Sequence, residues 1–147
     1  MLLRHFTTKE KLPLIIKDGY LKSLKFKRKE KGRLYFEEYK GNDFLIDFVL
    51  SDESKKHLTK DDYISLFFES EVLEQNYIEI KQSTIYTKKE AVVGIDTVFT
   101  KEEQSQIGDY YIVIDQVVPL RLSTNETKRL LEEFEATLCL SKSEPSI

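Results

Sequence analysis

The residues best suited to chemistry in this 147-residue chain are its two histidines, and each stands two positions before a threonine. They occur as His5-Phe6-Thr7 and His57-Leu58-Thr59. Because imidazole changes its charge near neutral pH, a histidine can move a proton or hold a ligand hydroxyl by a hydrogen bond. His5 follows an apolar segment and is expected at the end of a strand, whereas His57 lies in a polar segment and is expected in a solvated loop.

Three segments, in a definite order, form a pattern around His5. The first is Leu3-Arg4-His5-Phe6-Thr7, followed by a predicted helix that Gly19 ends. The second is Gly32-Arg33-Leu34-Tyr35-Phe36, and the third runs from Asp109 to Val117. Together they resemble the motifs of the ADP-ribosyltransferase-like superfamily: a strand with His-x-Thr, a strand with an aromatic pair led by Tyr, and a strand opened by an acidic residue. The resemblance implies an NAD-binding, split β-sheet fold over residues 1–122.

The resemblance also implies roles for five residues. His5 would hydrogen-bond the ribose next to nicotinamide, Tyr35 would stack on the nicotinamide ring, and Thr7 and Gly19 would contact the dinucleotide. Asp109 would orient the ribose and polarise the nucleophile, with His5 as the other catalytic residue. NAD would be the substrate and no metal would be needed. The implied activity is mono-ADP-ribosylation of a protein or nucleic acid by a toxin or by a phage or mobile-element effector.

The acidic position of the third motif has more than one candidate. If Tyr110 takes the place of the usual glutamate, the catalytic acid is missing. If Asp109 takes it, one extra residue precedes Ile112 and the carboxylate is shorter. These alignments differ in structure, because a shift of one residue in a strand turns a side chain to the other face. Asp115 and Gln116 are further candidates.

Other interpretations stand beside the transferase. The departure of the third motif from the usual glutamate favours a non-catalytic interaction module, such as an inhibitor or an immunity-type protein. The two His-x-Thr sequences also resemble the paired motifs of two-histidine phosphoesterases, with His5 and His57 as base and acid. Purely structural interpretations are that Tyr35 is a core aromatic, Asp109 a turn residue and Gly19 the stop of a helix.

A basic segment, Lys22–Arg33, carries seven cations and the single acid Glu30. Alternating apolar residues predict a strand, and the cations on its other face are candidates for phosphate contacts. The residues expected to make them are Lys25, Lys27, Arg28 and Lys29. The alternative is a charged edge strand that prevents pairing with other chains.

Composition excludes several other classes of protein. A single cysteine, Cys139, rules out an internal disulfide framework and a cysteine-rich zinc site. No apolar run is long enough to span a membrane, and charge interrupts the start of the chain too early for a signal peptide. With a formal net charge of −3, the chain is expected to be a cytoplasmic protein without membrane partners.

The elements that would position these residues predict an α+β single domain. We expect a split mixed or antiparallel sheet with flanking helices over residues 1–140 and a flexible tail over residues 141–147. Expected strands are Leu2–Thr7, Arg33–Tyr39, Phe44–Leu50 and Tyr110–Val118, with further alternation between Tyr77 and Phe99. Expected helices begin at the capping residues Thr8, Thr59 and Ser123, and the first ends at Gly19.

Overall fold

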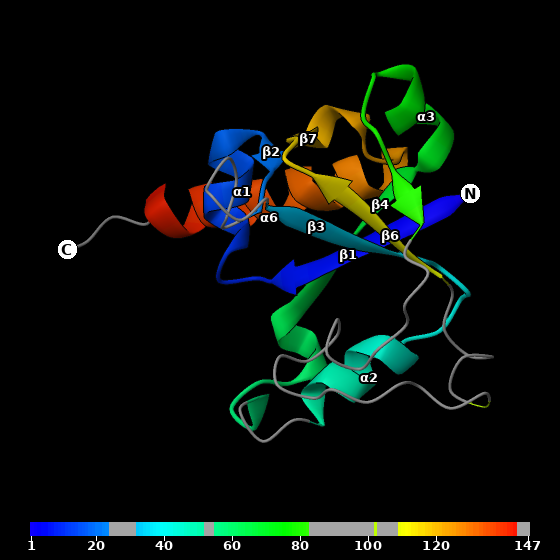
Figure 1. Cartoon of the computed structure of the whole chain (residues 1–147). Coiled ribbons are helices and arrows are strands. Elements are labelled where there is room, and N and C mark those ends of the chain that lie inside the picture. Colours follow the sequence, from blue (N-terminus) through cyan, green and yellow to red (C-terminus); the bar gives the residue numbers. More distant parts are fainter. Residues whose placement is uncertain (24–31, 52–54, 83–101, 103–108, 144–147) are drawn as a thin grey trace.

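A five-stranded antiparallel sheet with the order β4-β1-β3-β6-β5 forms the centre of the molecule (Figure 1). The computed structural model describes residues 1–23, 32–51, 55–82, 102 and 109–143. In chain order the elements are β1 (Leu2–Thr8), α1 (Leu12–Asp18), β2 (Tyr20–Leu21), β3 (Arg33–Glu38), α2 (Phe44–Leu50), the 3-10 turn η2 (Lys60–Asp62), β4 (Tyr63–Glu69), α3 (Ser70–Gln75), β5 (Lys81–Gln82), β6 (Tyr110–Ile114), β7 (Val118–Pro119), the 3-10 turn η3 (Leu120–Leu122) and α6 (Asn125–Ser143). Strands β2 and β7 pair separately. The α+β class with an antiparallel sheet is therefore confirmed.

One face of the sheet packs against α1, α3 and α6, and we call it the core face. Side chains alternate along each strand, so every second residue of β1, β3 and β4 points to this side. The largest buried cluster lies here and is apolar throughout; its members from the five-stranded sheet are Leu3, Leu34, Phe36, Ile64, Leu66, Phe68 and Val113. This cluster supplies most of the hydrophobic burial that closes the fold.

The opposite face, which we call the cavity face, packs against α2. Figure 1 shows α2 on the other side of the sheet from α1 and α3. A smaller cluster joins this helix to the sheet, with Leu45 and Tyr110 buried and Phe6, Phe44 and Phe48 partly buried. On the same face, β1 contributes Arg4 and β3 contributes Glu37, and both are buried. This face is therefore part apolar and part charged.

The sheet opens between β1 and β3. Strand β1 pairs with β4 along all its residues, from Leu2 to Thr8. With β3, the described ladder comprises the pairs Leu3–Glu38 and Arg4–Glu37. Beyond Arg4 the two strands diverge into a fork, which is visible in Figure 1 as the growing separation of β1 from β3. The expectation of a split sheet agrees with this arrangement.

Two predicted elements were wrong in type. Phe44–Leu50 is a helix and not a strand, because Leu45, Ile46 and Val49 are buried at helical spacing and Asn42 caps the Phe44 amide at 3.0 Å. The helix expected after Thr59 is only the single 3-10 turn η2, although its capping box with Asp62 is present. Strand β4 follows that turn at once.

Three boundaries also differ from the predictions. His5 lies in the middle of β1, which continues to Thr8, and α1 begins later than expected, after Lys11. The strand expected up to Val118 ends at Ile114, because Asp115 has a left-handed backbone with φ of 49°. None of the helices in the described part of the chain combines the length and apolar character needed to cross a bilayer.

Candidate functional site

A cavity of about 110 Å³ lies in the fork between β1 and β3, and we call it the fork cavity. Its lining comes from the two diverging strands, with one residue from α2 and one from β6. The lining residues are Arg4, His5, Phe6, Tyr35, Phe36, Glu37, Leu45 and Tyr110. His5 and Tyr35, which the sequence assigns to one site, therefore line one cavity. Its volume is below the roughly 150 Å³ of a cavity that holds benzene, so a six-membered ring would enter it only in part.

His5 bridges the fork with its imidazole. Nδ1 lies 2.9 Å from the backbone oxygen of Tyr35. A carbonyl oxygen can only accept, so Nδ1 carries the proton and donates it, which leaves Nε2 as an acceptor in the neutral ring. Burial lowers the pKa of His5 from its usual 6.5, so the ring is neutral near pH 7. His5 thus offers a basic nitrogen of known tautomer.

Tyr35 and His5 approach the cavity from opposite faces of the sheet. His5 pairs with Leu66 on the core face, and its ring centroid lies 5.5 Å from that of Phe36. Tyr35 pairs with Ile112 and shares the cavity face with Glu37. The two side chains can line the same cavity because it lies where the strands have separated.

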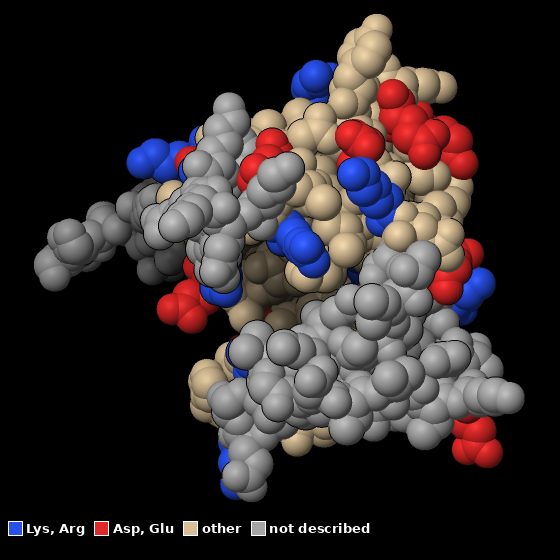
Figure 2. Space-filling model, in the orientation of Figure 1, with Lys and Arg blue, Asp and Glu red and all other residues tan. Residues whose placement is uncertain are grey.

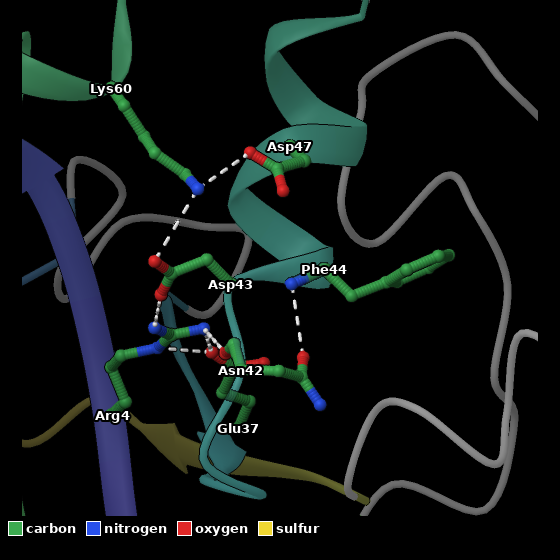
Figure 3. A network of polar contacts seen from close by, with 7 residues as sticks. All are labelled: Arg4, Glu37, Asn42, Asp43, Phe44, Asp47 and Lys60. Carbon is green, nitrogen blue, oxygen red and sulfur yellow. Dashed lines mark hydrogen bonds and ion pairs between the residues drawn. The ribbon is translucent and has the colours of Figure 1, made fainter.

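A buried ion pair forms the polar wall of the fork cavity. The side chains of Arg4 and Glu37 are 2% and 5% exposed, and both Nε and Nη2 of Arg4 contact Oε1 of Glu37. Nη1 donates to Asp43 at 2.8 Å, and Nη2 donates to the backbone oxygen of Asn42 at 3.2 Å (Figure 3). Burial raises the pKa of Glu37 above its usual 4.5, and the charge of Arg4 only partly offsets this.

The same network ties α2 to the sheet. Asp43 immediately precedes α2, and its bond to Arg4 lowers the pKa of its carboxyl group. Lys60, from η2, lies 3.5 Å from Asp43 and 3.1 Å from Asp47 of α2 (Figure 3). The partners of Lys60 are about half-exposed, so these outer pairs are weak compared with the buried one.

The other residues assigned by the resemblance lie elsewhere. Thr7 is buried on the core face opposite Ile64. Gly19 ends α1 with φ of 81°, and its carbonyl accepts from the Leu120 amide at 2.9 Å, so it has the predicted role of a helix stop. Neither residue lines the fork cavity.

The candidate acids of the third motif are also outside the fork cavity. Asp109 accepts a hydrogen bond from Gln82 at 2.8 Å, on an exposed part of the sheet edge. Asp115 accepts from the Gly32 amide at 2.9 Å and lines a second cavity of about 180 Å³ with Glu79, Lys81 and Ile114. Tyr110 does line the fork cavity, and Glu37 is its partner across the β3–β6 pair.

Two further predictions concern residues away from the fork. His57 is exposed in a turn before η2, as expected, and is not part of the fork cavity lining. The basic residues Lys25, Lys27, Arg28 and Lys29 lie outside the described residues, as does most of the alternating segment up to Phe99.

Sequence reasoning missed Arg4 and Glu37 as members of the site. Part of the signal was present, because Arg4 is the lone full charge of its predicted strand and Glu37 carries the opposite charge in another predicted strand, although Glu38 beside it is equally acidic. Opposite charges in neighbouring strands of one sheet are candidates for a cross-strand pair. The register that brings them together depends on tertiary pairing.

Within the described residues, no group of three or more His, Cys, Asp or Glu lies together as metal ligands would. Comparisons with protein-family models, with curated proteins and with solved structures find no match to this chain. The function must therefore be argued from the site itself and from the motif resemblance.

Proposed function

We propose that this chain binds NAD with its nicotinamide end in the fork cavity and transfers ADP-ribose to a macromolecule. The observation that supports this most directly is that His5 and Tyr35, from two motifs separated by 29 intervening residues, line one cavity where the sheet opens. A cavity of about 110 Å³ has room for part of one ring of the dinucleotide, and the remainder would lie outside it.

The chemistry of the lining suits such a ligand. Nε2 of His5 is the acceptor nitrogen and can receive a hydrogen bond from a ribose hydroxyl. The ring of Tyr35 offers an aromatic surface for a flat, cationic ring. Both groups would hold the ribose–nicotinamide bond in one orientation, which lowers the entropic part of the barrier.

Transfer also needs a carboxylate. The bond between ribose C1′ and the nicotinamide nitrogen breaks and its electron pair leaves with the ring. The target nucleophile bonds to C1′ and gives up its proton to the solvent. Positive charge grows on the ribose, and a nearby carboxylate stabilises it. Glu37 is the one carboxylate among the described residues of the fork cavity lining, so we assign it the role that the resemblance gave to Asp109.

The binding part of the proposal is tested by calorimetric titration with NAD. Tyr35→Phe keeps the ring and should bind NAD as the wild type does, whereas Tyr35→Leu should weaken binding by about tenfold. Tyr77→Leu makes the same change at a tyrosine that is 91% exposed and outside the cavity, and should have no effect. A wild-type chain that does not bind NAD would refute the proposal.

The transfer part is tested by incubation of the chain and a cell lysate with labelled NAD. Label should appear on a protein or nucleic acid, and His5→Ala should abolish it while His57→Ala does not. Loss of label in Glu37→Gln with NAD binding retained would support the assigned carboxylate.

A second candidate is a non-catalytic module that binds its ligand or partner without chemistry. What favours it is that Asp109 lies outside the cavity and that Glu37 is already held by Arg4. NAD binding without any transfer of label would select this candidate over the transferase.

A further inference from the structure

We infer that the fork cavity selects a positively charged ring or alkylammonium group over a neutral or negatively charged group of the same shape. The inference rests on the proposed function for its location, since it names the chemical class that the same cavity takes. Two kinds of observation carry it, namely the aromatic lining and the balance of charge around Arg4.

Four aromatic residues line the cavity: Phe6, Tyr35, Phe36 and Tyr110. The face of an aromatic ring attracts a cation, most strongly where water is excluded. Rings on this face of the sheet already hold one cation, because the guanidinium carbon of Arg4 lies 4.8 Å from the ring centroid of Tyr39 and 5.9 Å from that of Phe6. The cavity beside them offers further ring surface.

The charges of the described residues around the cavity sum to a negative value. Among the described lining residues Arg4 is the only cation, and it contacts two carboxylates, Glu37 and Asp43, which leaves one negative charge in excess. The next pair outward, Lys60 and Asp47, cancels itself. His5 adds no charge near pH 7, because burial holds its pKa below the usual value.

An anion is disfavoured for a further reason. It would have to displace Glu37 or Asp43 from Arg4, and a displaced Glu37 would be a buried charge without its partner. Removing one member of a buried ion pair is costly. A cation needs no such displacement, and it is favoured by the excess negative charge of Asp43, which contacts Arg4 just outside the cavity lining.

Three probes of nearly equal shape test the selection by calorimetric titration at low salt: the N-methylnicotinamide cation, neutral nicotinamide and the nicotinate anion. The cation should bind about tenfold or more tightly than nicotinamide, and nicotinate should bind least. Equal or tighter binding of nicotinamide or nicotinate would overturn the inference, and so would the failure of all three probes to bind.

Two charge-neutralising variants separate the contribution of charge from that of shape. Asp43→Asn leaves the cavity wall intact, because Asp43 does not line it, and should weaken cation binding by about threefold without changing nicotinamide binding. Glu37→Gln should remove the preference for the cation altogether. If Glu37→Gln does not fold, Asp43→Asn still decides, since its side chain is 46% exposed.

The matched control is Glu74→Gln on α3, which packs on the core face. In Figure 2 acidic side chains gather at the upper right, in the region that Figure 1 labels α3, away from α2. This variant makes the same change in net charge and should leave the affinity of every probe unchanged. An effect equal to that of Asp43→Asn would attribute both to general electrostatics and overturn the inference.

Titration with NAD and with its reduced, uncharged-ring form separates this inference from the proposed function. If the N-methylnicotinamide cation binds and NAD does not, the proposed function fails and the cation site stands. If NAD and its reduced form bind equally, the cation selection fails and NAD binding stands.

Discussion

Strands β1, β3 and β4 contribute Leu3, Phe36 and Phe68 to one face of the sheet, and Arg4, Glu37 and Phe67 to the other. The core face is closed mainly by hydrophobic burial. The cavity face is closed partly by a buried ion pair. Such a pair adds little to stability, because well-packed apolar residues in its place are often as stabilising or more so. The contrast indicates that the cavity face is arranged for binding, while the core face holds the fold together.

The largest expected effect is on the core face. Phe68 is fully buried, and its ring packs edge-on against that of Phe36, with the two ring centroids 5.8 Å apart. Phe68→Ala should lower the free energy of unfolding by about 3–5 kcal/mol. Phe6→Ala, on the cavity face, should cost less, because Phe6 is only partly buried and already adjoins a cavity. Urea unfolding of both variants tests the contrast, and equal losses would contradict it.

The buried ion pair provides the next largest effect. Arg4→Met leaves Glu37 buried without its partner and should lower the free energy of unfolding by about 3 kcal/mol. The double variant Arg4→Met, Glu37→Leu removes both charges and should recover to within about 1 kcal/mol of the wild type. Calorimetric melting measures both, and a double variant no more stable than Arg4→Met would show that the pair is needed for the fold itself.

The same double variant should lose the cation preference of the fork cavity. Such a result would separate stability from binding at these two positions, since apolar residues can replace the pair in packing but not in charge. Asp43→Asn, which removes only the exposed partner of Arg4, is the milder control for folding.

Local patterns predicted much of the core face and little of the cavity face. The strands that hold His5 and Tyr35 and the glycine stop of α1 follow from short-range signals such as alternation and capping. The start of α6 follows to within one residue, because Thr124 caps the helix in place of the predicted Ser123. The α2 segment was misjudged because short apolar runs do not distinguish a strand from a buried helix. The segment after Thr59 was misjudged because a correct capping box says nothing about where the helix stops.

The site was only half predictable for a related reason. His5 and Tyr35 belong to motifs that can be recognised in the chain, and they do line one cavity. The Arg4–Glu37 pair depends on the register of β1 against β3, which pairs residues 33 positions apart. Asp109 lies outside the cavity because it immediately precedes β6, whose first residue, Tyr110, lines the cavity.

A smaller effect concerns the pH dependence of stability through His5, whose imidazole lies on the core face. Its pKa is lowered in the folded chain, so the unfolded chain takes up the proton first as the pH falls. Stability should therefore decrease as the pH drops below about 6.5 and should level off below the folded pKa. His5→Gln keeps a donor for the Tyr35 carbonyl and should remove this contribution.

The control for His5 is His57→Gln, at an exposed position in a turn. Urea unfolding at several values between pH 5 and pH 7.5 should give the wild-type slope for His57→Gln and a flatter one for His5→Gln. If both variants keep the wild-type slope, His5 titrates alike in the folded and unfolded chains, and its imidazole is not buried as described.

The smallest expected effect is a gain in stability from the relief of backbone strain at Tyr77, which follows α3 on the core side of the sheet. Tyr77 follows α3 with φ of 63°, in the left-handed region that favours glycine, and its side chain is 91% exposed. Its amide bonds to the Glu74 carbonyl and the Ile78 amide to the Leu73 carbonyl, a Schellman ending that brings Ile78 into the core. Tyr77→Gly should raise the free energy of unfolding by about 0.5–1 kcal/mol, while Tyr77→Ala should raise it less. A loss of stability in Tyr77→Gly would mean that the tyrosine ring contributes a contact that outweighs the strain.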